Sequence, residues 1–139
     1  MEKNKFRAWH NVEKTFKKIN SMYFSEKNNE PYCIMIGDKP YIFPNKKITI
    51  LSYTGLKDCK GREIFEGDII EFVVDEPLAE NREKRIIVGF VDFDRGSFWI
   101  NTKKRFYDGT NYTDETLLSN FAYCCEVVGS IYENRGLLK

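Results

Sequence analysis

Residues 53–70, with the sequence YTGLKDCKGREIFEGDII, constrain the fold of this chain more than any other segment. Gly55 and Gly61 permit positive φ values, which let the backbone reverse sharply without a clash at Cβ. Gly67 and Asp68 then lead directly into the apolar run Ile69–Val74, in which alternate residues share one face. A run of turns that feeds a curved apolar strand is typical of the entry into a small β-barrel.

The N-terminal part, about residues 1–55, is predicted to be a β-rich lobe. Gly37–Pro40 has the composition of a turn between two extended apolar runs. Residues 11–31 are rich in Lys, Asn, Ser and Glu, so we expect mainly a solvated loop there. The strands predicted for this lobe are residues 5–9, 22–24, 32–36, 41–43 and 47–51.

The remainder, about residues 56–139, is predicted to form an SH3-like small barrel between Leu56 and Tyr132. Residues 75–84 read as a charged, mobile loop, and Gly89 as a bulge or a bend of the barrel. Thr113–Thr116 offers oxygen caps for one short helix that would run through Leu118. The predicted strands are 69–74, 85–93, 98–100 and 123–132, the last with Cys125, Val127, Gly129 and Ile131 on one side.

The composition favours strands, and the positive and negative charges of the chain nearly balance. Aromatic residues make up 15% of the chain, and aromatic side chains fit the half-buried face of a sheet. The formal net charge is only +1, which argues against a strong general nucleic-acid binder. The first residues lack an apolar signal region, and no apolar run is long enough to span a bilayer. These features predict a cytoplasmic protein with reduced cysteines and no membrane association.

The sequence predicts no enzyme, no cofactor and no metal centre. The four cysteines show no CxxC spacing, and His10 is the only residue that could supply an imidazole. Asp92 and Asp94 stand two apart and could in principle pair. The simpler interpretation is that Asp94 begins the turn Asp94–Ser97 while Asp92 faces solvent, because a metal site needs several ligands.

The acidic residues of the 53–70 segment admit a functional and a structural interpretation. Asp58, Glu66 and Asp68 could form a small acidic site, or the two aspartates could accept hydrogen bonds from the backbone of their own turns. We favour the structural interpretation, since Asp beside Gly is what such turns require. The segment's signature residues are Tyr53, Gly55, Leu56, Asp58, Gly61, Glu66, Gly67 and Asp68.

The best candidate for a binding site is a run of cations and rings. Cations next to stackable rings suit single-stranded nucleic acid; the alternative is an exposed loop whose rings fold back onto the barrel. Trp99 is expected in the core, and Trp9 is open to either a core or a surface role. The candidate nucleic-acid contacts are Lys103, Lys104, Arg105, Phe106 and Tyr107.

Three stretches together resemble the YopX family of phage and prophage proteins. They are Lys5–Trp9, the segment 53–70, and the closing run Glu126–Asn134. The chain departs from the family pattern at His10, at Cys59 and at Arg135–Gly136. The resemblance implies a mostly β protein carried by a phage or prophage in a bacterial host, and it supplies no reaction and no catalytic residues.

Two functions follow as expectations. The first is a non-enzymatic accessory module that acts through contacts with a host or phage protein and with itself, as a homo-oligomer. The second is a nucleic-acid-binding regulator that uses the basic and aromatic residues of 103–112.

Overall fold

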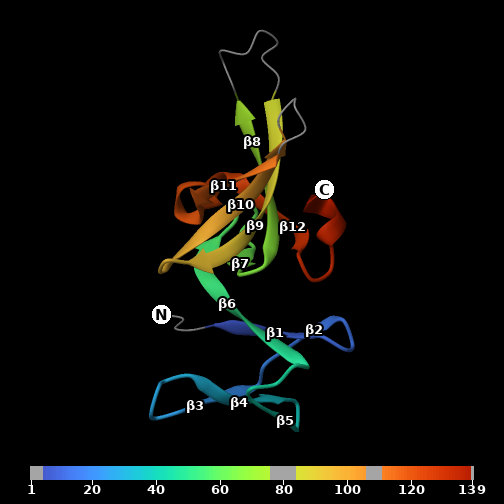
Figure 1. Ribbon diagram of the computed structural model, residues 1–139, viewed down its shortest axis with the longest axis vertical. Coiled ribbons are helices and arrows are strands. Elements are labelled where there is room, and N and C mark those ends of the chain that lie inside the picture. Colours follow the sequence, from blue (N-terminus) through green and yellow to red (C-terminus); the bar gives the residue numbers. More distant parts are fainter. Residues whose placement is uncertain (1–4, 76–83, 106–110, 139) are drawn as a thin grey trace. The chain divides into compact units, whose positions relative to one another are not determined.

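The computed structural model describes residues 5–75, 84–105 and 111–138 (Figure 1). Most of these residues lie in β-strands, and the only helical segments among them are three short 3-10 turns. The described residues include no helix that is long and apolar enough to cross a membrane. The chain divides into two compact units, Met1–Ser52 and Tyr53–Lys139.

The first unit contains two small antiparallel sheets. In one, β1 pairs on one side with β2 and on the other with the first half of β6. In the other, β4 lies between β3 and β5. The strands are β1 (Phe6–His10), β2 (Thr15–Lys17), β3 (Ser21–Phe24), β4 (Pro31–Ile36), β5 (Lys39–Ile42) and β6 (Ile48–Lys57).

The core of the first unit follows from the two-residue alternation of its strands. Met22, Ile34 and Tyr41 stand opposite one another across β3, β4 and β5, and Ile34 is fully buried. Ala8 and Ile48 complete the same cluster from the other sheet. The strands predicted for this unit are confirmed, with ends shifted by one or two residues except at the end of β6. That strand continues to Lys57, six residues beyond its predicted end and into the segment that was predicted to be a run of turns.

One strand of this unit was not predicted. Residues 11–31 were expected to form mainly loop, but β2 lies within them and pairs with β1. The reason is Phe16, whose ring packs edge-on against Trp9 with 4.8 Å between ring centroids. A single aromatic residue in a polar run is enough to hold a three-residue strand against its neighbour.

The second unit is built on one five-stranded antiparallel sheet. The spatial order is β11-β10-β9-β8-β12, and β7 pairs separately with the second half of β6. The sheet is twisted and curls around its core (Figure 1). The strands are β7 (Glu63–Phe65), β8 (Asp68–Asp75), β9 (Lys84–Asp94), β10 (Ser97–Arg105), β11 (Asn111–Leu117) and β12 (Cys125–Ser130).

The concave face of this sheet carries the core. Ile70, Val91 and Ile100 are buried on neighbouring strands β8, β9 and β10. The 3-10 turns η1 (Leu118–Asn120) and η2 (Ala122–Cys124) cover them with Leu118 and Ala122. A third 3-10 turn, η3 (Arg135–Leu138), lies near the C-terminus.

The predicted helix from Thr113 through Leu118 is wrong. Residues up to Leu117 form β11, which pairs with β10 in the register Thr116 opposite Ile100. A capping pattern is a local signal, whereas strand pairing brings a row of backbone hydrogen bonds from a distant segment. Thr113 and Thr116 are also β-branched, which suits them to a strand.

The last strand is shorter and less regular than predicted. β12 begins at Cys125 and ends at Ser130, and its pairing with β8 shifts between Val127 and Gly129. This β-bulge breaks the predicted common face of Cys125, Val127, Gly129 and Ile131. After the bulge Ser130 is buried and Val128 is exposed.

The second unit tests the prediction of a bulge or bend at Gly89. Gly89 is not at a bulge, because the β8–β9 ladder passes through it without a shift, and the β9–β10 ladder keeps its register up to the last pair, Gly89 with Thr102. A Cβ at Gly89 would lie 2.6 Å from the carbonyl oxygen of Asn101, so the glycine allows a close approach of two strands. The predicted mobile loop at 75–84 falls mostly outside the described residues.

Candidate functional site

The carboxylate of Asp58 is the centre of the signature turn. Its Oδ1 accepts hydrogen bonds from the backbone N–H of Lys60 (2.9 Å) and Arg62 (2.8 Å), and its Oδ2 accepts one from Val127 (2.9 Å). Burial alone would raise the pKa of Asp58, but the N–H donors of Val127, Arg62 and Lys60 outweigh it and lower the pKa. Asp58 is therefore a structural anion.

The same turn covers the outer edge of β12. The N–H of Cys59 donates to the carbonyl of Cys125 (2.9 Å), and the Arg62 guanidinium donates to the carbonyl of Val127 (3.3 Å). Together with the Asp58 bond to Val127, these contacts occupy backbone groups that would otherwise invite another strand.

The thiols beside this turn have different environments. Burial, followed by the nearby Asp58, raises the pKa of Cys125 to about 12, whereas Cys59 is exposed. A thiol with so high a pKa is protonated at neutral pH and is a poor nucleophile. Cys124 and Cys125 do not simply alternate along one strand, because Cys124 ends the turn η2.

The glycines and the second aspartate of the signature also serve the backbone. Gly55, Gly61 and Gly67 all have positive φ values, of +82°, +80° and +87°. Asp68 is buried, and its Oδ2 accepts a hydrogen bond from the N–H of Phe65 (2.8 Å). The structural interpretation of Asp58 and Asp68 is therefore supported.

The remaining signature residues are apolar or partly buried. Glu66 is half-buried, the ring of Tyr53 packs on Phe65, and Leu56 packs on the core.

Asp92 and Asp94 do not form a paired site. Asp94 Oδ1 accepts a hydrogen bond from the N–H of Arg95 (3.0 Å) and starts a hairpin turn in which Arg95 and Gly96 both have positive φ. Asp92 accepts a long hydrogen bond from Asn101 (3.5 Å). In the part of the chain that the structure describes, no group of three or more His, Cys, Asp or Glu residues could hold a metal ion.

The prediction that Trp99 fills the core is wrong. Trp99 is half-buried on the face opposite Ile100, its indole N–H donates to the carbonyl of Asp94 (2.9 Å), and the Arg95 guanidinium lies 4.5 Å from its ring centroid. Arg95 also pairs with Glu115. Trp9, by contrast, is 3% exposed and belongs to the interior of the first unit.

The predicted nucleic-acid contacts are only partly within the described residues. The backbone of Lys103, Lys104 and Arg105 forms the last part of β10 and pairs with the beginning of β11. Phe106 and Tyr107 lie outside the described residues. The proposed combination of cations and rings therefore stays a prediction.

Sequence reasoning missed the outer face of the β3-β4-β5 sheet. Tyr23, Cys33 and Ile42 stand opposite one another across the three strands, on the side away from Met22, Ile34 and Tyr41. Tyr23 is 47% and Ile42 is 68% exposed. The signal was present in the sequence, because these short strands carry apolar residues at both odd and even positions.

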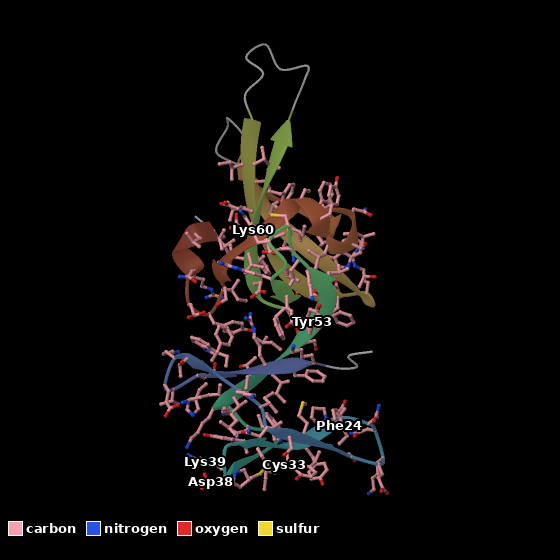
Figure 2. All side chains as sticks on the ribbon, turned by 180° about the vertical axis from the view of Figure 1, so that it is seen from behind. Phe24, Cys33, Asp38, Lys39, Tyr53 and Lys60 are labelled. Atoms are coloured by element: carbon pink, nitrogen blue, oxygen red, sulfur yellow. The ribbon has the colours of Figure 1, made fainter. Side chains whose placement is uncertain are left out.

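Two further exposed aromatic residues lie at one end of the sheet. Phe24 is 40% and Tyr32 is 48% exposed, and the rings of Tyr23 and Tyr32 are 6.3 Å apart, so Tyr32 extends this surface. Figure 2 labels Phe24 and Cys33 on this sheet. We call Tyr23, Tyr32, Cys33 and Ile42 the outer aromatic face.

Comparison with known proteins adds a family and similarity to solved structures. A family model described as YopX protein matches residues 5–139. The crystal structure of protein EF1440 from Enterococcus faecalis is similar over 100% of both chains, with 26% sequence identity and a TM-score of 0.62. A search of curated proteins gives no match.

Proposed function

This chain belongs to the YopX family, and from that premise we propose that it is a phage or prophage accessory protein of the bacterial cytoplasm. In this proposal it performs no catalysis and acts as a protein-interaction module that associates with itself. A host or phage protein is the further partner. The outer aromatic face of the first unit is the observation that carries the proposal.

An exposed apolar face favours association for a simple energetic reason. Burying apolar surface contributes about 25 cal/mol per Å², and monomeric proteins rarely expose contiguous apolar patches of more than a few hundred Å². Three of the exposed large apolar side chains among the described residues, Tyr23, Tyr32 and Ile42, gather on this one face. Covering them with a second protein surface therefore stabilises the complex.

The second unit supports a binding role in a different way. We propose that its curled sheet is an SH3-like small barrel, an architecture that hosts many unrelated binding functions. Both oxygens of the Asp58 carboxylate accept hydrogen bonds from backbone N–H groups, and the buried thiol of Cys125 stays protonated at neutral pH. Neither group is poised for chemistry.

The test is the mass of the protein in solution, measured by light scattering at micromolar concentration. We expect a mass larger than one chain for the native protein, and a shift towards one chain for Tyr23→Ser and Ile42→Ser. The matched control is Val12→Ser, which removes an apolar side chain that is 69% exposed in the same unit but outside the face. A native protein that stays monomeric contradicts the proposal.

A nucleic-acid-binding regulator is the second candidate, favoured by three consecutive cations at the end of β10. Binding of this kind releases counterions and weakens steeply with salt. We would measure the affinity for single-stranded DNA and RNA at several salt concentrations, with and without the change of Lys103, Lys104 and Arg105 to Ala. No binding by the native protein at low salt eliminates this candidate.

A further inference from the structure

A hollow of about 400 Å³ opens in the first unit beside β4 and β5. Its volume lies within the range of small-ligand sites, about 300–1,000 Å³. One side of the hollow is the loop between β3 and β4, and the other is the chain that follows β5. The lining residues are Ser25, Asn28, Glu30, Pro31, Tyr32, Phe43 and Pro44.

The loop side of the hollow is fixed by its own hydrogen bonds. The backbone N–H of Ser25 donates to the carbonyl of Glu30 (2.8 Å), and the N–H of Asn29 donates to the carbonyl of Ser25 (2.9 Å). Asn28 Oδ1 accepts a hydrogen bond from the N–H of Glu30 (3.2 Å), and its Nδ2 donates to Glu30 Oε2 (3.3 Å). The exposed Glu30 carboxylate thus has a hydrogen-bond partner in its own loop, the amide of Asn28.

The opposite side of the hollow is held to the sheet. The N–H of Phe43 donates to the carbonyl of Tyr32 (2.8 Å), which continues the ladder between β4 and β5 by one more bond. This bond links the segments that carry the two aromatic linings, Tyr32 and Phe43. The hollow thus has a rigid frame on both sides.

The chemistry of the lining is that of a cation site. It combines one carboxylate, on Glu30, with two rings whose faces carry negative potential, on Tyr32 and Phe43. The hydroxyl of Ser25 and the side-chain carbonyl of Asn28 add acceptor capacity. No lysine or arginine lines the hollow, and within the described residues no cation forms an ion pair with Glu30.

We propose that this hollow binds an arginine or lysine side chain presented by a protein partner. A planar guanidinium matches the site best, because it can bond a carboxylate in a bidentate manner while its plane stacks on an aromatic ring. Anions are disfavoured by Glu30, and a purely apolar group would desolvate that carboxylate without supplying a charge to pair with it. The exposed rings of Tyr23 and Phe24 beside the hollow provide apolar contact for the residues flanking the bound cation. This site does not depend on self-association of the protein.

The experiment titrates the full chain with the peptide Gly-Ser-Arg-Ser-Gly, blocked at both ends, and follows backbone amide signals by NMR. The matched probe replaces Arg with citrulline, which has the same shape and no charge. We expect saturable shifts confined to residues 23–32 and 43–45 of the native protein. The arginine peptide should bind about tenfold more tightly than the citrulline peptide, since a charge-assisted bond is roughly twice as strong as a neutral one.

Comparing Glu30→Gln with Glu26→Gln distinguishes binding in the hollow from a general attraction of the peptide to negative surface charge. Glu30→Gln should weaken arginine binding about tenfold, whereas Glu26→Gln, in the same loop but not in the lining, should change it by less than about twofold. Tyr32→Leu keeps the apolar wall and removes the ring, so it should weaken binding without abolishing it. Because Tyr32 lines the hollow and also belongs to the outer aromatic face, Ile42→Ser, the variant designed to disrupt self-association, should bind the peptide at least as tightly as the native protein does.

The proposal is overturned by any of three results. These are an absence of shifts, an equal affinity for the citrulline peptide, and an equal effect of Glu30→Gln and Glu26→Gln. A monomeric native protein that still binds the arginine peptide leaves this site intact and removes only the self-association proposed above.

Discussion

At the scale of single residues, the signature segment combines a side chain that accepts hydrogen bonds from backbone N–H groups with glycines in left-handed turns. Asp58 accepts three N–H groups, one of them from Val127, sixty-nine positions further along the chain. Gly67 holds a positive φ while its N–H donates to the carbonyl of Val91 and its own carbonyl accepts from Ile131. In this segment the strands are connected by hydrogen bonds to the Asp58 carboxylate and by backbone hydrogen bonds at Gly67, where the absence of a side chain permits the positive φ.

Asp58→Asn tests the connection between the turn and β12. The amide can still accept from Lys60 and Arg62, but its NH₂ group cannot accept the N–H of Val127. We expect a loss of about 1.5–3 kcal/mol in the free energy of unfolding by urea, the cost of a hydrogen bond to a charged group. Asp38→Asn, in an exposed turn, is the control, and an equal small effect of both changes would contradict the assignment.

The lowered pKa of Asp58 predicts a pH dependence with a defined sign. A carboxyl whose pKa is lower in the folded than in the unfolded state contributes stability above its unfolded pKa of about 4, and loses it as the pH falls through the folded pKa. The stability difference between the native protein and Asp58→Asn should therefore be constant at neutral pH and shrink in acid. A difference that grows on acidification would be inconsistent with this sign.

Gly67→Val tests the left-handed turn. The new side chain would be strained at φ +87°, and its Cβ would lie 2.8 Å from a ring carbon of Tyr132. We expect destabilisation by more than about 1 kcal/mol, measured by urea unfolding. Gly61→Ala has the same φ constraint in open space and should cost less, and Gly136→Val, with neither constraint, should be nearly neutral.

At the scale of elements, the sequence predicts the strands where an apolar alternation is long, and fails where pairing is decided by a distant partner. Ile69–Val74 and Arg85–Phe93 are found as β8 and β9 because each buries one face through several alternations. Thr113–Leu118 carries a helix-capping pattern, yet its pairing with β10 makes it a strand. The bulge at Val128 and the three-residue β2 leave no periodic signal at all.

The candidate sites were harder to predict than the strands for a related reason. The side of a short strand that faces the core depends on which sheet covers it, so Tyr23 and Ile42 could not be told from core residues beforehand. The turn role of Asp58 was predictable because Asx-type bonding is local. Its bond to Val127 was not, since that contact joins segments far apart in the sequence.

The position of each strand in the second sheet predicts its amide exchange. β9 is the central strand, and its neighbours β8 and β10 are themselves paired on both sides, so the N–H groups of β9 should exchange slowest. β11 is paired on one side among the described strands and should exchange faster. Hydrogen exchange followed by mass spectrometry checks this order, and equal protection of β11 and β9 would indicate a further strand at that edge.

At the scale of the whole molecule, two separate clusters of buried residues hold the two units. Ile34 lies at the centre of one cluster, and Ile100 belongs to the other. The chain passes from one unit to the next within β6, whose first half pairs with β1 and whose second half pairs with β7. Each unit thus has its own apolar interior, joined by a continuous strand.

Ile34→Ala and Ile100→Ala test how independent the two interiors are. Each change removes a fully buried side chain and should destabilise its own unit by about 2–5 kcal/mol. We expect hydrogen exchange to accelerate in residues 5–52 for Ile34→Ala and in the second unit for Ile100→Ala. Acceleration spread equally over both units would show that they unfold together.

The covering of β12 by the turn around Asp58 has a consequence for how copies of the second unit could accumulate. As far as the described strands extend, the sheet is sealed along one margin and terminates in β11 at the other. A sheet with two unpaired edges can add further copies at both edges without limit, whereas a sheet with one unpaired edge can pair with only one other copy. Because the signature turn occupies backbone groups at the β12 edge, we expect any edge-to-edge pairing through this sheet to be limited to the β11 edge.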